Sequence, residues 1–459
     1  MPARIIHALV AVALLAAVPA AADEMADQIR KVQAKVAPAT VIVSFYIERE
    51  DGARAGAHVL GTVVGKDNLV MFSSAAIPSE FALSQFHDFK VKVTDGLDVN
   101  AYEAEYLGKD NQAQAAFVRV TDPKTPALPV LVFNEKAKVR VGDPLVSVAN
   151  LGEPDGFARL LQPVRVVARI DQPVTTYLCT KGLGAPGSPV VTLDGKVVGI
   201  VGLVRLNQAT NARPKWSVAQ VLWPVERFIE RLRNPPKGGK SVKQAWVGVH
   251  TLTPVTKDLA EYFKLGEGRG VVVGHVIEGS PADKAGLKSE DIILSVDGTA
   301  VSGTEGQLVE NFINTIRQRD VGEKLTFEVW REGKTRQVAV TLAPAPKGPG
   351  EAERYAIEPF GMTVRELVAS DRMARELPQD ETGVVVLFLK PAGWAADGGL
   401  RMGDIIKKVQ DRPTPDLKTF RKIFDDEVAQ KPKEVVLFVL RGKKDTQLVR
   451  IEPRWDADK

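Results

Sequence analysis

The sequence predicts a mainly β fold that is divided among several domains. At 459 residues, the chain is longer than one ordinary hydrophobic core accommodates. Its N-terminal half alternates short apolar runs with Gly, Asp and Pro, a pattern typical of an all-β barrel or sandwich. Its C-terminal half repeats itself at a constant spacing, which predicts two further units of one kind.

Composition excludes several classes of function. The chain is 44% hydrophobic and 26% charged, as folded soluble proteins are. Its net charge of +4 is spread along the sequence, whereas nucleic-acid-binding proteins concentrate basic residues. A single cysteine, Cys179, excludes an intrachain disulfide, and 5 histidines leave little room for a histidine-rich site. We expect no metal, no cofactor and no nucleic-acid partner.

Residues 1–22 have the features of a secretory signal peptide. Arg4 supplies a positive start, an apolar stretch follows, and Ala20 to Ala22 form a small-residue cleavage site. The stretch is short for a bilayer span, although an uncleaved membrane anchor is the alternative. We expect a periplasmic or otherwise exported protein with no integral membrane segment after removal of the signal.

The elements of the first domain, residues 23–232, follow from short apolar periodicities. Pro224 near a first turn favours a closing helix. The expected elements are a helix at 27–35, strands at 39–46, 61–64, 69–72, 115–120, 144–148, 163–170, 189–191 and 196–204, and a helix at 227–233.

Two stretches rich in Pro, Gly and charge, residues 233–244 and 344–353, read as linkers. They set off two C-terminal domains of about 100 residues each, 245–343 and 354–455, a reasonable domain size. Gly248, Gly286-Leu287 and Asp291-Ile292-Ile293 recur 113 positions later as Gly361, Gly399-Leu400 and Asp404-Ile405-Ile406. Each unit has β-rich runs, at 270–273 and 383–387. Each also has one amphipathic helix, with apolar faces formed by Leu308, Val309, Phe312, Ile313 and Ile316 or by Leu417, Phe420 and Phe424.

The repeated units resemble the PDZ domains of the HtrA/DegP (Do-like) family of periplasmic serine proteases. That family has a strand, an X-Leu-Gly-X loop and a Ser-Pro-Ala-x-x-Ala-Gly-Leu-x-x-Gly-Asp-Ile-Ile segment. The loops here are Trp246 to Val249 and Phe360 to Thr363. The segment from Ser280 to Ile293 is a strong match, and the segment from Ala392 to Ile406 is a looser one.

The first domain is similar to the trypsin-like double β-barrel of the same family. The similarity lies in residues 36–41, 139–151, 195–200 and 216–218. The resemblance implies a trypsin-like double β-barrel followed by two PDZ domains. It also implies assembly through trimers of the barrel domain.

At the catalytic positions the sequence departs from the family. Alignment places Ala75 at the histidine, Gln114 at the aspartate and Pro186 at the serine. Alanine cannot accept the serine proton, and glutamine cannot stabilise an imidazolium ion as a carboxylate does. Proline also lacks the N–H that normally forms half of the oxyanion hole. We expect no catalytic residues and no protease activity of the usual kind.

Other nucleophiles are open alternatives. A shifted register brings Ser188 near the expected site, and Cys179 is a second candidate. The histidines of the first domain are His58 and His87. We interpret both as surface or strand-end residues rather than general bases, and Cys179 as a buried, inert thiol.

The remaining expected activity is peptide recognition. By resemblance, each PDZ groove adds an extended peptide to a sheet edge and holds its terminal carboxylate on loop N–H groups. The helix residues have the alternative role of core filling. The expected peptide-binding residues are Val247, Gly248, Val249, Leu308 and Phe312 in the first unit and Phe360, Gly361, Met362, Leu417 and Phe420 in the second.

The sequence therefore indicates an exported HtrA-like pseudoprotease. Its expected ligands are C-terminal or unfolded segments of envelope proteins, in the role of chaperone-like scaffold or regulator of active HtrA proteases. A homo-trimer or a hetero-oligomer with such proteases is the implied assembly. The alternatives are an active serine endopeptidase that uses Ser188 and a structural envelope protein whose PDZ grooves are occluded.

Overall fold

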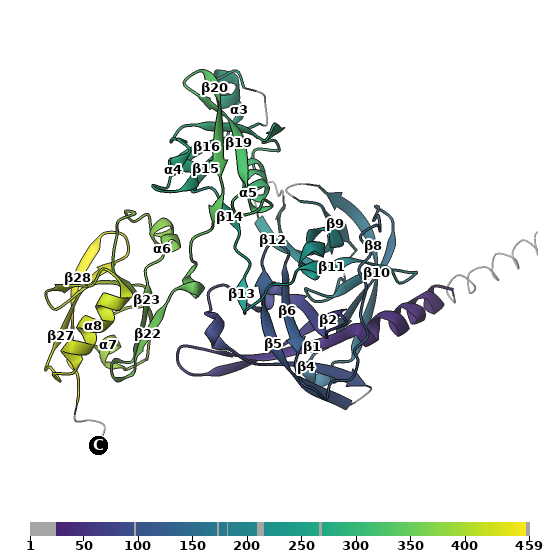
Figure 1. Ribbon diagram of the computed structural model, residues 1–459, viewed down its shortest axis with the longest axis horizontal. Helices are drawn as coiled ribbons and strands as arrows, with labels where there is room; N and C mark the ends of the chain where they lie inside the picture. The colour runs from purple at the N-terminus through teal and green to yellow at the C-terminus, as the bar shows by residue number, and fades with distance from the viewer. Residues whose placement is uncertain are drawn as a thin grey trace, which may run out of the picture. The chain divides into compact units, whose positions relative to one another are not determined.

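The computed structural model describes residues 24–95, 98–171, 174–180, 182–208, 215–265 and 269–455 (Figure 1). The predicted signal peptide at 1–22 lies outside these residues. The chain forms two compact units. Of the described residues, one unit contains those up to Tyr46, Gly56–Ile77 and Asp88–Val242, and the other contains Ile47–Ala55, Pro78–His87 and those from Lys243 onward.

The first β-barrel has six strands. They are β1 (Thr40–Glu48), β2 (Arg54–Gly65), β3 (Leu69–Ser73), β4 (Phe86–Asp95), β5 (Asp98–Asp110) and β6 (Ala115–Val120). Their order is β5-β4-β1-β2-β3-β6, and pairing of β5 with β6 closes the ring. A short strand, β13 (Lys240–Ser241), runs parallel to β5 outside the ring.

The second barrel also has six strands and closes in the order β10-β11-β12-β9-β8-β7. The strands are β7 (Pro144–Asn150), β8 (Arg159–Ile170), β9 (Thr176–Cys179), β10 (Pro189–Thr192), β11 (Val197–Gln208) and β12 (Lys215–Pro224). The chain therefore has the predicted double barrel, with closed sheets that leave few exposed strand edges.

A single hydrophobic core joins the two barrels. It contains Met71 and Phe117 from the first barrel and Ile200 and Trp223 from the second. The helix at residues 24–36 adds Val32 and Val36 to this core. The closing segment, η5 (Val225–Arg227) and α2 (Ile229–Arg233), packs against it as well. Both predicted helices are therefore confirmed, and both cover the barrel core.

The first C-terminal repeat is a sheet with the order β15-β16-β17-β19-β20, and α5 (Leu308–Arg317) covers it. The strands are β15 (Val249–Pro254), β16 (Val271–Val276), β17 (Ile292–Val296), β19 (Lys324–Arg331) and β20 (Lys334–Thr341). The short elements are β14 (Ala245–Trp246), α3 (Lys257–Tyr262), α4 (Pro281–Lys284), β18 (Thr299–Ala300) and β21 (Ala343–Pro344). Strand β15 is the edge of this sheet in the part of the chain that is described.

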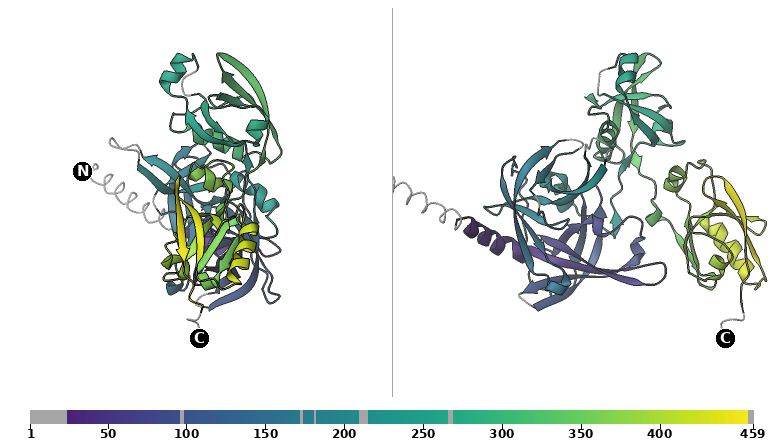
Figure 2. Two further views of the ribbon diagram at one scale, coloured as in Figure 1. Left: turned by 90° about the vertical axis from the view of Figure 1, so that its left-hand side faces the viewer. Right: turned by 180° about the vertical axis from the view of Figure 1, so that it is seen from behind.

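The second repeat has the same strand order with one strand added at that edge, β22-β23-β24-β25-β27-β28. The strands are β22 (Arg354–Ile357), β23 (Met362–Glu366), β24 (Val384–Leu389), β25 (Ile405–Val409), β27 (Val435–Arg441) and β28 (Asp445–Ile451). The remaining elements are α6 (Ala369–Ala374), α7 (Trp394–Asp397), β26 (Arg412–Pro413) and α8 (Leu417–Val428). Figure 2 shows the elements of both repeats from two further sides.

The aspartate of the repeated motif is part of a buried ion pair in both repeats. Asp291 accepts hydrogen bonds from Arg331 at 2.5 and 2.6 Å, and the same guanidinium donates to the Gly286 carbonyl at 2.8 Å. In the second repeat, Asp404 and Arg441 form the same arrangement, at 2.7 and 2.8 Å. Such fully hydrogen-bonded pairs are structural, because removal of one partner leaves a charge buried alone.

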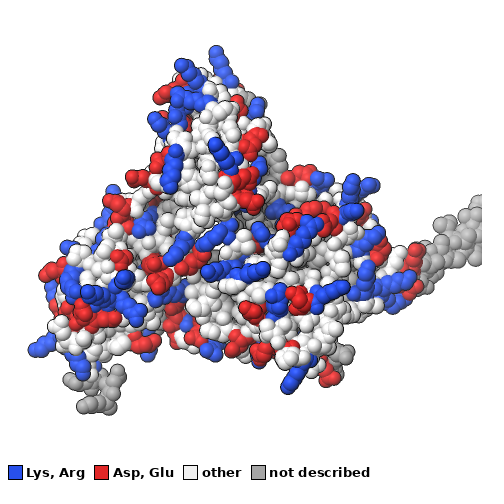
Figure 3. All heavy atoms as spheres, viewed as in Figure 1, with Lys and Arg blue, Asp and Glu red and all other residues white. Residues whose placement is uncertain are grey.

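Charges of both signs are mixed on the face shown in Figure 3. Lys and Arg lie among Asp and Glu rather than in one basic patch on that face. This distribution agrees with the near-balance of charge in the sequence.

Candidate functional site

The three positions aligned with the family's catalytic residues lie together in the first unit. Ala75 is in η2 (Ser74–Ala76), directly after β3, and the Ser74 N–H donates to the Gln114 carbonyl at 3.2 Å. The turn that contains Pro186 packs beside the same segment, since a Cβ on Gly187 would lie 3.0 Å from the Ser73 nitrogen. The structure therefore brings Ala75, Gln114 and Pro186 to one place.

Gln114 connects two segments of this unit. Its side-chain amide donates to the Leu203 carbonyl at 2.8 Å and accepts from the Leu203 N–H at 2.9 Å. A neutral amide carries both a donor and an acceptor, whereas a carboxylate only accepts. The side chain at the aspartate position therefore links the start of β6 to β11.

The N–H groups of the loop before β10 are largely used inside the protein. The Gly184 N–H donates to the Ser147 hydroxyl at 3.1 Å, and the Gly187 N–H donates to the Val201 carbonyl at 2.8 Å. The Ser188 N–H donates to the Ala185 carbonyl at 3.0 Å. Pro186 has no N–H to donate. An oxyanion at this loop would therefore not find the usual pair of free backbone donors.

Ser188 is fully buried. Its hydroxyl is shielded from solvent and has no hydrogen-bond partner among the described residues. The histidines lie elsewhere: His58 contacts Glu153 at 3.2 Å, and His87 contacts Glu48 at 3.6 Å. Serine attack requires a base within hydrogen-bond reach, and neither imidazole is paired with this hydroxyl.

Cys179 ends β9 and is partly buried. Burial raises the pKa of its thiol to about 11. The thiolate is the nucleophilic form of cysteine, so a raised pKa lowers the fraction of reactive thiolate at neutral pH.

In the first repeat, the loop before β15 offers two N–H groups on one side. The Val247 carbonyl accepts from the Ala282 N–H at 2.8 Å, and the Gly248 carbonyl accepts from the Ile277 N–H at 2.9 Å. A trans peptide unit places its N–H opposite its carbonyl. The N–H groups of Gly248 and Val249 therefore point away from these partners, as an anion-binding loop requires.

The predicted helix residues of the first groove are core residues. Leu308 and Phe312 are buried in the cluster that α5 forms with the sheet. Val249, Leu252 and Val309 are only partly buried at the border of this cluster. The sequence pattern did not separate the inner residues of the helix from those at its border.

In the second repeat, the chain's own β22 covers the edge at which a peptide was expected. It pairs antiparallel with β23, with Ile357 opposite Met362. Leu417 and Phe420 of α8 are buried in the same core cluster as Ile357 and Phe360. The prediction of an open groove at Phe360, Gly361 and Met362 is thus not met in this structure, because a strand that the sequence did not reveal lies there.

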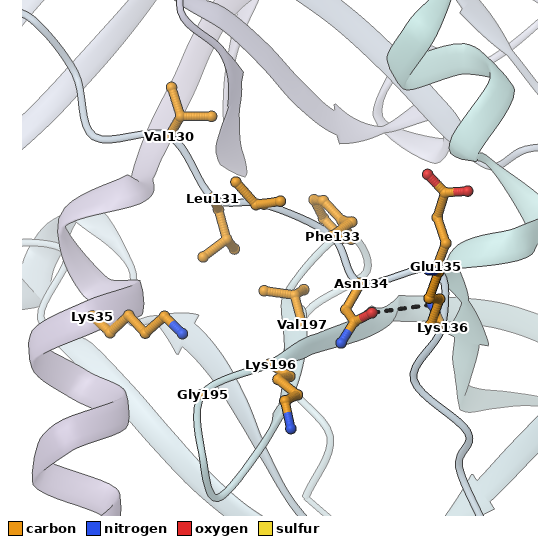
Figure 4. A pocket seen from close by; sticks show the side chains of 11 residues that line it. Lys35, Val130, Leu131, Phe133, Asn134, Glu135, Lys136, Gly195, Lys196 and Val197 are labelled. Atoms are coloured by element: carbon orange, nitrogen blue, oxygen red, sulfur yellow. Dashed lines mark hydrogen bonds between the residues drawn. The ribbon is translucent and has the colours of Figure 1, made fainter.

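A separate pocket of about 560 Å³ lies in the first unit (Figure 4). Lys35, Leu131, Phe133 and Val197 line it, and the Lys136 N–H donates to the Asn134 side chain at 3.0 Å beside it. None of the residues predicted for catalysis or peptide binding borders this pocket.

Within the described ranges, no group of three or more His, Cys, Asp or Glu residues is arranged to hold a metal ion. No helix in those ranges is long and apolar enough to cross a membrane.

Comparison with known proteins agrees with this architecture. Residues 59–200 match the family described as a trypsin-like peptidase domain, and residues 248–342 match the PDZ domain. The chain is 28% identical over 374 residues to a probable periplasmic serine endoprotease DegP-like of Brucella suis, covering 77% of this chain and 65% of that protein. It is 25% identical over 379 residues to the protein of the same description from Hahella chejuensis, covering 80% and 74%.

Solved structures show the same fold. A variant of the HtrA-type protease AlgW with decapeptide has a TM-score of 0.52 at 16% identity, covering 69% of this chain and 98% of that chain. AlgW with tripeptide has a TM-score of 0.50 at 17% identity, covering 70% and 98%. The chain is therefore similar over most of its length to DegP-like periplasmic serine endoproteases, and it contains a trypsin-like peptidase domain followed by a PDZ domain.

Proposed function

We propose that this protein is an exported pseudoprotease of the HtrA type that binds peptides through its PDZ domains. Its ligands are C-terminal or unfolded segments of envelope proteins. It acts as a chaperone-like scaffold or as a regulator of active proteases of the same family.

The observation that carries this proposal is the arrangement around Gln114 and Pro186. A base is absent at Ala75, the glutamine amide is held by Leu203, and the Gly184 N–H is held by Ser147. Loss of the nucleophile and base costs about 10⁶ in rate in a serine protease, and loss of one oxyanion donor costs about 10²–10³. Together these features support a barrel domain without hydrolytic activity.

The first repeat supports the peptide-binding part of the proposal. Strand β15 is a sheet edge that begins at two N–H groups, those of Gly248 and Val249, which point away from the partners of the neighbouring carbonyls. A peptide added at this edge gains main-chain hydrogen bonds, and its carboxylate meets the loop. We propose that assembly, as a homo-trimer or with active relatives, brings several such grooves together and raises avidity.

A fluorophosphonate probe tests the catalytic part. We expect no labelling of the mature protein under conditions that label an active HtrA protease completely. Covalent labelling that disappears in Ser188→Ala would instead establish an active peptidase, the alternative function. Cleavage of unfolded casein, followed in parallel, provides a second measurement.

Calorimetry with a panel of peptides with apolar C-termini tests the binding part. We expect binding that requires a free carboxylate, so amidated versions of the same peptides serve as matched controls. If neither form of any peptide binds, the structural alternative with occluded grooves is favoured.

A further inference from the structure

The two repeats differ at the edge where a PDZ ligand adds. In the first repeat β15 is the edge strand, and in the second repeat β22 lies beyond the equivalent strand β23. The segment runs antiparallel to β23, with Tyr355 opposite Val364 and Ile357 opposite Met362. A bound C-terminal peptide adopts this position when it extends a sheet.

Two side chains of β22, those of Tyr355 and Ile357, face helix α8. Ile357 is 5% exposed and belongs to the core cluster that contains Phe420 and Phe424. Tyr355, two residues earlier, donates its hydroxyl to Asp425, and the Arg421 guanidinium lies 4.9 Å from the centre of its ring. Alternate residues of β22 therefore pack against α8 from the edge of the sheet beside β23.

In the loop that follows β22, the N–H of Gly361 is hydrogen-bonded within the protein, unlike the equivalent N–H of Gly248 in the first repeat. The Gly361 N–H donates to the Glu358 carbonyl at 3.0 Å, and the Gly361 carbonyl accepts from Lys390 at 2.7 Å. The second contact repeats the one between Gly248 and Ile277 in the first repeat, and the first contact is added. The Glu358 carbonyl therefore accepts the hydrogen bond of the Gly361 N–H. In the first repeat, the equivalent N–H of Gly248 is proposed to bind a ligand.

The start of β22 is also held. Arg354 donates to the Gln85 side chain at 2.7 Å and to the Glu80 carbonyl at 3.1 Å, and it forms an ion pair with Glu50. Desolvation lowers the pKa of this guanidinium and Glu50 opposes that shift, so the charge is largely withdrawn from water and paired. The segment is fixed at both ends rather than loosely attached.

From these contacts we infer that residues 354–357 are an intrachain ligand of the second PDZ groove. We also infer that their sequence indicates which peptide sequences this groove recognises. The ligand class is a peptide with an aliphatic C-terminal residue and an aromatic residue two positions before it. The inference rests on the proposed function, peptide binding by PDZ grooves, and makes binding at the second groove conditional on release of β22.

The consequence is competition. An outside peptide binds only to the fraction of molecules in which β22 has left the groove, so its apparent affinity falls by that fraction. A tethered segment competes at an effective concentration in the mM range. Weakening β22 is therefore expected to tighten binding of an outside peptide by at least about tenfold.

A reversible lock tests this competition in the mature full-length protein. Ala356 and Thr363 are opposite each other across β22 and β23, within the range that a disulfide spans. The test protein carries A356C and T363C, with Cys179→Ala to remove the native thiol and Gly248→Val to disable the first groove. The probe is a fluorescein-labelled peptide that ends in Arg-Tyr-Ala-Ile with a free carboxylate.

We expect the reduced protein to bind this probe and the oxidised protein to bind it at least tenfold more weakly. Tyr355→Ser without the lock is expected to tighten binding about tenfold. Tyr262→Ser, a change of the same type at a residue of the first repeat that is 79% exposed, is the matched control. Equal affinities in both redox states, or no effect of Tyr355→Ser, would mean that β22 is a permanent strand and would overturn the inference.

Hydrogen exchange on the unaltered protein provides a measurement that needs no substitution. At saturating unlabelled peptide, amides of 354–357 are expected to exchange faster while those of 362–366 remain protected. Unchanged protection of 354–357 contradicts the inference. Peptide binding to the first groove, measured with Gly248 intact and the lock closed, reports the proposed function separately. If the first groove binds no peptide, the proposed function is contradicted, and the result for β22 can still be interpreted.

Discussion

Gln114 and the backbone of Leu203 form two hydrogen bonds, one in each direction, at 2.8 and 2.9 Å. The two residues are 89 positions apart in the chain. This contact gives the aspartate position of a protease family a structural task. The amide joins the residue just before β6 to strand β11.

Gln114→Glu is expected to destabilise the barrel domain by about 1–3 kcal/mol, because the carboxylate loses the donor to the Leu203 carbonyl and faces that carbonyl oxygen instead. The midpoint of urea unfolding, followed by a probe in the barrels, measures the change. Gln337→Glu, at an exposed position of β20, adds the same charge and is the control. Equal midpoints for the two variants would contradict the structural role of the amide.

Gly248→Val is expected to abolish peptide binding by the first repeat. Its φ of +90° disfavours any side chain, and an added Cβ would lie 2.1 Å from the Ser280 Cβ. The loop must shift and its N–H groups turn away from the ligand. Gly279→Val is the control, because it carries a similar φ of +70° with nothing within 4 Å of the added Cβ. Calorimetry with an apolar C-terminal peptide should distinguish the variants, and retention of binding by Gly248→Val would exclude this loop as the carboxylate site.

Asp371 predicts an acid-sensitive second repeat. Burial alone would raise the pKa of its carboxyl, but hydrogen bonds from Arg365 at 2.6 and 2.7 Å outweigh burial and lower it. A folded-state pKa below the unfolded one stabilises the protein above the unfolded value, about 3.9. This stability is lost as the pH falls through the folded value, below about pH 4.

Urea unfolding of the second repeat between pH 7 and pH 3 measures this effect. Asp371→Asn is expected to be less stable at pH 7 and to lose less stability on acidification than the unaltered protein. Parallel pH profiles for the two proteins would show that Asp371 does not contribute to the acid response.

Cys179 is expected to resist alkylation. With a thiol pKa of about 11, its thiolate fraction at pH 8 is about a hundredfold below that of an exposed cysteine. Labelling by iodoacetamide, followed by mass spectrometry, should be slower than labelling of glutathione by at least that factor. When the protein is unfolded in 6 M guanidinium chloride, Cys179 should be labelled as fast as glutathione. Fast labelling of the folded protein would contradict an inert thiol.

The elements that the sequence predicted well are those whose apolar residues dominate the pattern. The run at Ala115–Val120 coincides with β6, and the amphipathic patterns after Leu308 and Leu417 are helices. Strands β4, β5, β9 and β12 were missed. In β4 and β5, residues such as Lys90 and Glu103 face outward and leave no continuous apolar run. The polar stretch at His87, interpreted as exposed, begins β4.

The candidate site could be located from the sequence because motif residues mark it, but its internal contacts could not. The bonds from Gln114 to Leu203 and from Gly184 to Ser147 join residues far apart in sequence, and no local pattern reports them. Strand β22 has only four residues and directly follows a stretch interpreted as a linker. A segment of that length has too few residues for a periodicity, so its place in the groove becomes visible only in three dimensions.

The motif aspartates Asp291 and Asp404 have a structural role in their repeats, and this limits what their substitution can show about ligand binding. Since Arg331 and Arg441 occupy both carboxylates, changing either aspartate leaves a partly buried arginine without its partner and is expected to destabilise that repeat. A loss of ligand binding on substitution of either aspartate would therefore report stability rather than specificity. Substitutions around β15, β22 and α8, away from these ion pairs, are the ones expected to change ligand preference.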